Sequence, residues 1–230
     1  MELNQLRKYT SSRISIVVPC FNEEETISIF YTETLKVLKE MNIESYEFVF
    51  VDDGSSDNTL LKFRELSEKD TNVHFISFSR NFGKEAALYA GLSKAKGTYT
   101  AVMDADMQDP PSLLPQMLEA IEKEGFGCAA TRRVTRKNEP VIRSFFARMF
   151  YKIMRKMSDV QVVDGARDFR LMTESYRKAV VSLCERNRFT KGIFHGLVLR
   201  QSGLNTKILR ELQERRNGLS GSYLNTRLTA

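Results

Sequence analysis

The chain has 230 residues, of which 42% are hydrophobic, 28% charged and 10% aromatic. These are ordinary values for a globular domain, so they exclude a disordered, collagen-like or coiled-coil chain. The formal net charge of +6 favours an anionic partner without identifying it.

Short apolar runs alternate with longer amphipathic stretches along residues 14–131. The runs, rich in β-branched residues, predict strands at 14–18, 46–51, 73–77, 99–103 and 127–131. The stretches between them predict helices at 26–41, 56–69, 84–94 and 111–123, with Ser56 or Asp57 capping the second. Strands that alternate with helices predict an α/β fold on a mainly parallel sheet. Ligands of such sheets bind at the carboxyl ends of the strands.

Several classes of protein are disfavoured by what the sequence lacks. No run approaches the ~18 consecutive apolar residues of a membrane span, and the polar N-terminus has no secretory apolar centre. Cys20, Cys128 and Cys184 are odd in number and far apart, which favours reduced thiols in a cytoplasmic protein. Two histidines, His74 and His195, exclude a His-rich metal site.

Polar clusters directly follow four of the predicted strands. They occupy residues 19–23, 52–57, 79–84 and 104–110. Each cluster alone is compatible with turn chemistry, because Asp, Asn, Gly and Ser are favoured in turns. Four in succession at one edge of a sheet favour a binding site instead.

Carboxylates carry the chemical signal in these clusters. Asp104 and Asp106 would repel each other unless a cation lay between them, and a hard divalent cation would keep positions open for phosphate oxygens. Asp53 ends another strand, where it can accept hydrogen bonds from a base or a ribose. Basic residues that suit phosphates lie at neighbouring strand ends: Arg80, Lys84, Arg132 and Arg133. Neither a Gly-x-Gly-x-x-Gly nor a Gly-Lys-Ser/Thr motif occurs, which disfavours dinucleotide dehydrogenases and P-loop NTPases.

These motifs resemble those of family 2 glycosyltransferases of the GT-A fold, and within them the polyprenyl-phosphate sugar transferases. That group includes bactoprenol glucosyltransferase and dolichol-phosphate mannose synthase. The resemblance is carried by Val-Pro-Cys-Phe-Asn-Glu at 18–23, Asp-Asp-Gly-Ser at 52–55, Arg-Asn-Phe-Gly-Lys at 80–84, Asp-Ala-Asp-Met-Gln-Asp-Pro-Pro at 104–111 and Asp-Phe-Arg-Leu-Met at 168–172. It implies a GT-A domain over 1–194, with a nucleotide-sugar half at 1–130 and an acceptor half at 131–194.

The resemblance also implies roles for individual residues. The nucleotide sugar would be bound by Pro19, Phe21, Glu23, Asp53, Lys84, Asp104, Ala105, Asp106 and Arg132. Mg²⁺ or Mn²⁺ would be held by Asp104 and Asp106 with Gln108. Asp168 would face the acceptor with Arg170 beside it for the acceptor phosphate, although the two could instead merely pair with each other. The implied reaction is inverting transfer of a hexose from a nucleotide sugar, with UDP favoured, to a polyprenyl phosphate in cell-wall or polysaccharide biosynthesis.

Residues 140–157 predict a basic amphipathic helix with aromatic residues on its apolar side. This pattern is typical both of a helix packed on a core and of a helix on an anionic membrane surface. Because the acceptor implied by the resemblance resides in a membrane, we favour the surface. The protein would then lie peripherally at the inner face of the membrane, without a transmembrane segment in this chain. Membrane-linked relatives also make a homo-oligomer plausible.

The resemblance stops after Phe194. The family continues with a Trp-containing stretch around Gly-Glu-Thr-Lys, whereas residues 195–230 are polar and the chain has no Trp. If one nucleotide is removed after the codon for Phe194, the residues that follow can be reread, with third bases chosen to fit, as strings like that continuation. We therefore predict that 195–230 is an out-of-frame tail after a frameshift, which the coding DNA tests. His195 is then no catalytic base, and activity could be lost.

Two other functions fit the motifs less well. One is a family 2 transferase that acts on a polysaccharide or another soluble acceptor, and the other is an inactive nucleotide-binding remnant. Nucleic-acid binding is disfavoured, because the basic residues are scattered among carboxylates rather than gathered in a stripe with aromatic residues.

Overall fold

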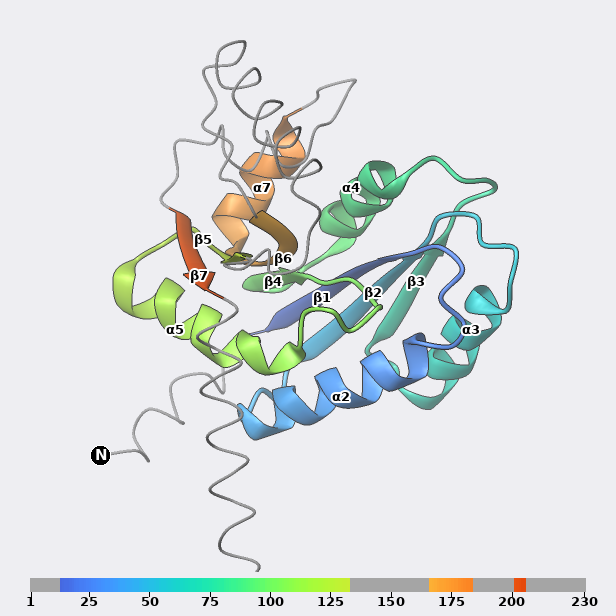
Figure 1. The fold of residues 1–230 in the computed structure, drawn as a ribbon, viewed down its shortest axis with the longest axis horizontal. Helices are drawn as coiled ribbons and strands as arrows, with labels where there is room; N and C mark the ends of the chain where they lie inside the picture. The colour runs from blue at the N-terminus through green and yellow to red at the C-terminus, as the bar shows by residue number, and fades with distance from the viewer. Residues whose placement is uncertain (1–12, 133–165, 184–200, 206–230) are drawn as a thin grey trace, which may run out of the picture.

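The computed structural model describes residues 13–132 and 166–183 together with the backbone of 201–205. These residues form a seven-stranded sheet in the order β3-β2-β1-β4-β6-β5-β7, covered by helices (Figure 1). The strands are β1 (Ile14–Cys20), β2 (Tyr46–Asp52), β3 (Val73–Ser77), β4 (Tyr99–Val102), β5 (Cys128–Arg132), β6 (Ala166–Thr173) and β7 (Gln201–Asn205). The helices are α2 (Ile27–Glu40), α3 (Thr59–Lys69), α4 (Lys84–Lys94), the 3-10 turn η1 (Pro111–Leu113), α5 (Leu114–Glu124) and α7 (Glu174–Ser182).

The sheet is mainly parallel, as the sequence predicts. Strands β1, β2, β3 and β4 pair in parallel, and so do β5 and β7. Only β6 runs against its neighbours among the described strands, because it pairs antiparallel with both β4 and β5. This insertion brings the segment around Asp168 next to β4, whose carboxyl end leads into Asp104.

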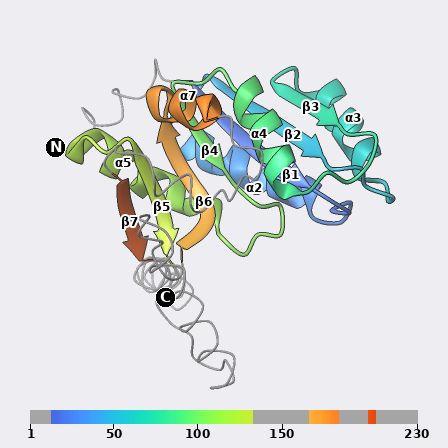
Figure 2. The same ribbon diagram turned by 90° about the horizontal axis from the view of Figure 1, so that it is seen from above.

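Helices cover both faces of the sheet. One face packs against α2, α3 and α5 around fully buried side chains such as Phe30, Phe63 and Met117. The other face packs against α4 and α7 around Leu88 and Tyr176, and Figure 2 looks onto this side. The predicted α/β fold is therefore confirmed.

The predicted strands and helices in the first half of the chain are all present, with boundaries shifted by a few residues. The predicted cap of α3 is misplaced, because the N-cap is Asn58, without a side-chain capping bond. The Asp57 carboxylate nevertheless accepts the Thr59 N–H at 3.0 Å. Strands β6 and β7 and helix α7 were not anticipated.

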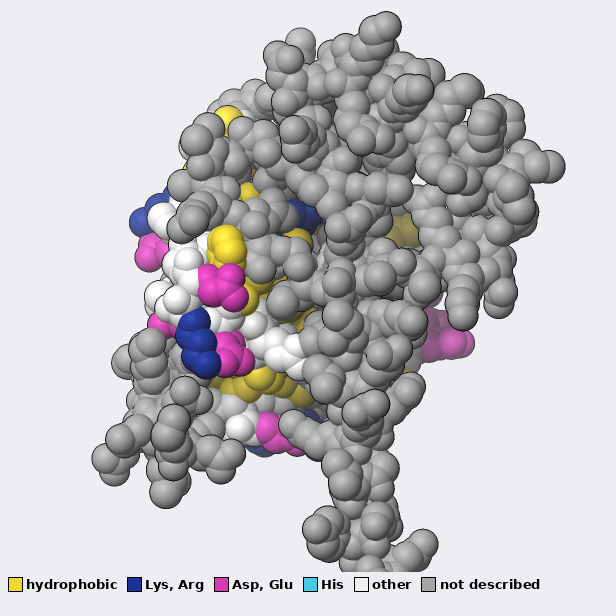
Figure 3. All heavy atoms as spheres, turned by 60° about the vertical axis from the view of Figure 1, so that its left-hand side comes forward, with side chains coloured by type: hydrophobic (Ala, Val, Ile, Leu, Met, Phe, Trp, Pro, Cys, Tyr) yellow, Lys and Arg dark blue, Asp and Glu magenta, His cyan; other side chains and the backbone are white. Residues whose placement is uncertain are grey.

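Among the described residues, no helix combines the length and the apolar character that crossing a bilayer requires. The helix predicted at 140–157 lies outside the described residues, and so does His195. Acidic and basic side chains lie interspersed on the described part of the face in Figure 3, as is typical of a solvated surface.

Candidate functional site

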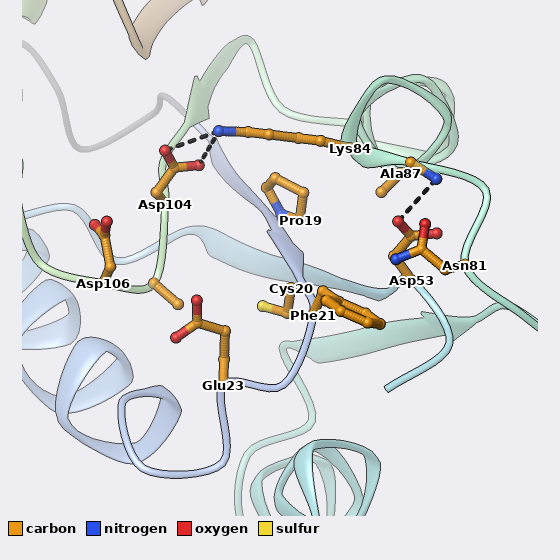
Figure 4. Close-up of a pocket in the computed structure, with 12 residues that line it drawn as sticks. Pro19, Cys20, Phe21, Glu23, Asp53, Asn81, Lys84, Ala87, Asp104 and Asp106 are labelled. Atoms are coloured by element: carbon orange, nitrogen blue, oxygen red, sulfur yellow. Dashed lines mark hydrogen bonds and ion pairs between the residues drawn. The ribbon is translucent and has the colours of Figure 1, made fainter. Parts of the chain in front are cut away.

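A cavity of about 370 Å³ opens at the carboxyl ends of β1, β2 and β4 (Figure 4). Parallel sheets bind ligands at this position, because the loops that follow neighbouring strands converge there. The cavity is lined by Pro19, Cys20, Phe21, Glu23, Asp53, Asn81, Gly83, Lys84, Ala87, Asp104, Ala105 and Asp106. The structure thus brings together all the predicted nucleotide-sugar residues except Arg132.

The loop after β1 supplies an aromatic side chain to the cavity. Phe21 is 46% exposed although it is large and apolar, so its ring is available to a ligand. The loop is held by reciprocal hydrogen bonds with the loop after β2. Asn22 does not line the cavity. Its N–H donates to the Ser55 hydroxyl and its side-chain oxygen accepts the Ser56 N–H, both at 2.9 Å. These bonds keep Phe21 at the cavity wall.

The two consecutive aspartates after β2 have different partners. Asp52 accepts the Ser55 N–H and the Ser77 hydroxyl, both at 2.9 Å, so it closes its own turn and ties it to β3. Asp53 faces the cavity and accepts the backbone N–H groups of Phe82 and Gly83 at 2.7 and 2.9 Å. Both carboxylates are almost fully buried.

Lys84, the first residue of α4, extends along the cavity to Asp104 (Figure 4). Its ammonium nitrogen lies 2.7 Å from Asp104 Oδ1 and 2.7 Å from Asp168 Oδ2. Burial disfavours the charged lysine, but the two carboxylates outweigh this effect and raise the pKa of Lys84. The lysine therefore stays protonated between two carboxylates, and a phosphate would fit beside it only with a cation that offsets their negative charge.

Two of the three residues predicted to hold a divalent cation lie at the cavity. Asp104 and Asp106 both line it, and the Gln108 N–H donates to Asp106 Oδ1 at 3.0 Å. The Gln108 side chain is not among the lining residues. In the described part of the chain, no group of three or more His, Cys, Asp or Glu side chains could hold a metal ion. Two carboxylates fit Mg²⁺ nevertheless, because that ion keeps several waters and takes further oxygens from substrate phosphates.

The two predicted acceptor-side residues lie in different environments. Asp168 is half-buried and contacts Lys84 at the cavity. Arg170 is only 1% exposed and lies beside the buried Cys128 and Tyr176, under α7. The structure therefore brings Asp168 to the site but does not bring Arg170 there. The side chain of Arg132 lies outside the described residues, although its backbone ends β5.

Four lining residues were not predicted as site residues: Cys20, Asn81, Gly83 and Ala87. The first three fall inside the motif segments 18–23 and 80–84, so their positions were available from the sequence. Ala87 lies one helical turn after Gly83, and only the approach of α4 to the sheet brings it to the cavity. Burial raises the pKa of the Cys20 thiol, and nearby carboxylates raise it further, which makes this thiol unreactive.

Comparisons with known proteins agree on one family. The profile of glycosyl transferase family 2 matches residues 15–180. The chain is 39% identical over 181 residues to the bactoprenol glucosyl transferase of Shigella phage SfV, covering 79% of this chain and 58% of the relative. It is 38% identical over 190 residues to the uncharacterized glycosyltransferase YkcC of Bacillus subtilis, covering 83% and 58%. The chain spans about three fifths of the length of the curated relatives it matches.

Solved structures share the fold. Glucosyl-3-phosphoglycerate synthase from Mycobacterium tuberculosis, in complex with Mn²⁺, UDP and phosphoglyceric acid, superposes with a TM-score of 0.61 at 18% identity, over 88% of this chain and 72% of that one. A mannosyltransferase from Pyrobaculum calidifontis, in complex with GDP-Man and Mn²⁺, gives a TM-score of 0.57 at 17% identity, over 84% and 55%. Their likeness confirms the GT-A fold that the sequence resemblance implied.

Proposed function

The chain belongs to glycosyl transferase family 2, and we propose that it transfers a hexose from a nucleotide sugar to a polyprenyl phosphate with inversion at the sugar carbon. We favour UDP-hexose as the donor and a divalent cation as the cofactor. The observation that carries the proposal is the convergence of Asp53, Lys84 and Asp104 on one cavity at the carboxyl ends of parallel strands.

The donor would lie across this cavity. Phe21 and Asp53 offer an aromatic surface and a hydrogen-bond acceptor to the nucleoside, and Lys84 offers its charge to the diphosphate. Asp104 and Asp106 would hold Mg²⁺ or Mn²⁺, with Gln108, whose N–H donates to Asp106, as the third proposed ligand. When bound, the cation would supply Lewis-acid stabilisation of the departing diphosphate. The complexes of the structural neighbours with Mn²⁺ and UDP or GDP-Man support this arrangement.

The acceptor would approach from the side of Asp168. A phosphate acceptor is already ionised at pH 7, so Asp168 would orient it or the lysine beside it rather than remove a proton. Asp168 is preferred to Arg170 for this role, because Asp168 contacts Lys84, which lines the cavity, whereas Arg170 is buried. Several relatives are named bactoprenol glucosyl transferases, and this name supports a polyprenyl phosphate as the acceptor. Because such an acceptor resides in a membrane, we propose that the protein lies at the inner membrane surface and contacts it through residues 140–157. Self-association of the chain is a further proposal.

The first test is calorimetric titration of the purified chain with UDP and with GDP, each in Mn²⁺ and in EDTA. We expect binding of UDP in Mn²⁺ and its loss in EDTA. A transfer assay with UDP-glucose then compares a short-chain polyprenyl phosphate in detergent with phosphoglyceric acid. Product on the soluble acceptor alone would overturn the lipid-phosphate proposal, and failure of a folded chain to bind either nucleotide would overturn the donor site.

The frameshift predicted after Phe194 remains a prediction, and it bears on the transfer assay. If residues 195–230 are out of frame, we expect the chain to bind the nucleotide without transferring sugar. It would then be an inactive nucleotide-binding remnant. The coding DNA decides this point, because the rereading requires particular third bases in the codons.

A further inference from the structure

We propose that Asp53 is a positioning residue for Lys84. Its carboxylate holds the backbone that leads into α4, and so determines where the lysine ammonium lies at the phosphate end of the cavity. This proposal rests on the proposed function, because it concerns the part of the site that would take the donor diphosphate. It goes beyond the sequence resemblance, which implies only that Asp53 binds the nucleoside.

The contacts of Asp53 point along the chain to Lys84. Asp53 is only 3% exposed. Its backbone N–H donates to the Cys20 carbonyl at 2.9 Å, and this bond anchors Asp53 to β1. Its two carboxylate oxygens accept from Phe82 and Gly83, one N–H each. Hydrogen bonds from N–H groups to a carboxylate are about twice as strong as neutral ones. The anchored carboxylate therefore restrains the two residues that immediately precede Lys84.

The surrounding backbone leaves this segment little freedom. Gly54 has φ of +71°, and a Cβ there would lie 2.4 Å from the backbone carbon of Arg80. The Phe78 N–H also donates to the Asp52 carbonyl at 2.9 Å. Residues 78–83 thus lie directly against the turn at 52–54, and the Asp53 bonds fasten the end of the segment that is nearest the helix.

Helix α4 has no side-chain cap of its own. Its N-cap is Gly83, at φ of +93° and ψ of 153°, without a side-chain capping bond. A negative charge near the first turn stabilises a helix, because the unpaired N–H groups there carry partial positive charge. Glu85 lies in the first turn itself, and Asp53 adds a second negative charge from a position 30 residues before Gly83, with a direct hydrogen bond to the N-cap N–H. It thereby fixes the start of α4, from which the Lys84 side chain departs.

Lys84 then carries the effect across the cavity. Its ammonium contacts Asp104, which belongs to the phosphate end, whereas Asp53 lies near the start of α4 (Figure 4). A change at Asp53 should consequently weaken binding of a ligand that has no nucleoside. A direct contact to the base would not have this consequence, so the two roles can be separated.

The test uses Mn²⁺-pyrophosphate, which has two phosphates and no base, in calorimetric titrations beside Mn²⁺-UDP. In Asp53→Asn, an amide NH₂ would face one of the two backbone N–H groups, so one of the bonds is lost. We expect this variant to bind Mn²⁺-pyrophosphate about 10–100-fold more weakly, by analogy with the loss of an outer-shell partner that orients a metal ligand. Lys84→Met should cause a similar loss. The double variant should be no weaker than Lys84→Met alone, because coupled residues are not additive.

Glu47→Gln is the matched control. Glu47 is a carboxylate only 2% exposed that accepts the Lys96 N–H at 2.7 Å, but it lies at the start of β2, at the opposite end of the strand. It should lower the melting temperature and leave the affinity for Mn²⁺-pyrophosphate unchanged. This control separates loss of stability from displacement of Lys84.

Two results would overturn the proposal. One is weaker binding of UDP by Asp53→Asn with unchanged binding of pyrophosphate, which would leave Asp53 a nucleoside contact only. The other is full additivity of Asp53→Asn and Lys84→Met. If the unaltered chain binds neither ligand, the proposed function fails. The link between Asp53 and Lys84 is then tested by the melting temperatures of the unaltered chain, Asp53→Asn, Lys84→Met and the double variant. Non-additive changes support the link, and additive changes overturn it.

Discussion

The ammonium group of Lys84 lies 2.7 Å from a carboxylate oxygen of Asp168, which is 84 positions further along the chain. The lysine begins α4 and the aspartate lies on β6. Because β6 is inserted antiparallel beside β4, this ion pair joins the segment predicted to bind the donor to the segment predicted to bind the acceptor. Both side chains are partly exposed, so the pair contributes little to stability and is available to a ligand.

Asp168→Asn should separate donor binding from transfer. The asparagine keeps the shape of the side chain but loses the charge, while Lys84 keeps its contact to Asp104. We expect the affinity for Mn²⁺-UDP to change by less than about threefold and the rate of transfer to fall by about 10²-fold, as is typical when a reactant is no longer held in position. Titration and a transfer assay on the same preparation measure both. Loss of nucleotide binding would show that Asp168 does not act on the acceptor side.

Asp104→Asn and Asp106→Asn should each abolish the dependence of nucleotide binding on metal. Removing a charged oxygen that is proposed to ligate the cation should cost at least the ~10–100-fold typical of outer-shell groups. The melting temperature should change little, because both side chains line an open cavity rather than the core. The measurement is UDP titration in Mn²⁺ and in EDTA. An unchanged affinity in Mn²⁺ for both variants would remove the metal assignment.

The sequence predicted the strands and helices of residues 13–132 because their apolar side chains repeat with the period of each element. It did not predict β6, whose place in the sheet depends on pairing with β4 and β5, far away in the chain. Local periodicity contains no information about such partners.

The candidate site was predictable in part. Motifs at strand ends correctly identified Asp53, Lys84 and Asp104 as neighbours, since strand order brings these ends together. They could not separate residues that face the cavity from residues that tie one loop to another, as Asp57 does by accepting the Glu24 N–H at 3.1 Å. Nor could they show that Arg170, two residues after Asp168 on the same side of β6, is covered by α7.

Asp70 should make stability depend on acid pH. Burial raises the pKa of this carboxyl, but hydrogen bonds from Asn72, Tyr31 and Tyr46 outweigh it and lower the pKa below its ordinary value. The stabilisation is therefore complete above the pKa of the unfolded chain, about 3.9, and is lost as the pH falls through the lower folded pKa. Asp70→Asn should cost about 1 kcal/mol at pH 7, the worth of a typical hydrogen bond.

The measurement for Asp70 is thermal unfolding at a series of pH values from 7 down to 2. The difference between Asp70→Asn and the unaltered chain should shrink below about pH 4, because the aspartate itself is then protonated. Glu68→Gln is the control, since Glu68 is an exposed carboxylate in the last turn of α3, two residues before Asp70. A difference that stays constant over the whole series would contradict the role of the Asp70 charge.

Gly91 should be the position in α4 that tolerates alanine least. A Cβ there would lie 2.4 Å from Val17 Cγ1 and 3.2 Å from Val51 Cγ2, and both atoms belong to stiff side chains in the sheet. Alanine favours a helix by up to ~1 kcal/mol over glycine, whereas overpacking a core costs ~1–3 kcal/mol. We therefore expect Gly91→Ala to lower the free energy of unfolding by about 1–2 kcal/mol. Ser93→Ala, at an exposed position of the same helix, should be neutral or slightly stabilising.

Since Lys84 begins α4, the shift of the helix in Gly91→Ala should also weaken Mn²⁺-pyrophosphate binding. Denaturant unfolding and the titration together test this, and a Gly91→Ala protein as stable as the unaltered one would show that α4 does not pack this closely on β1.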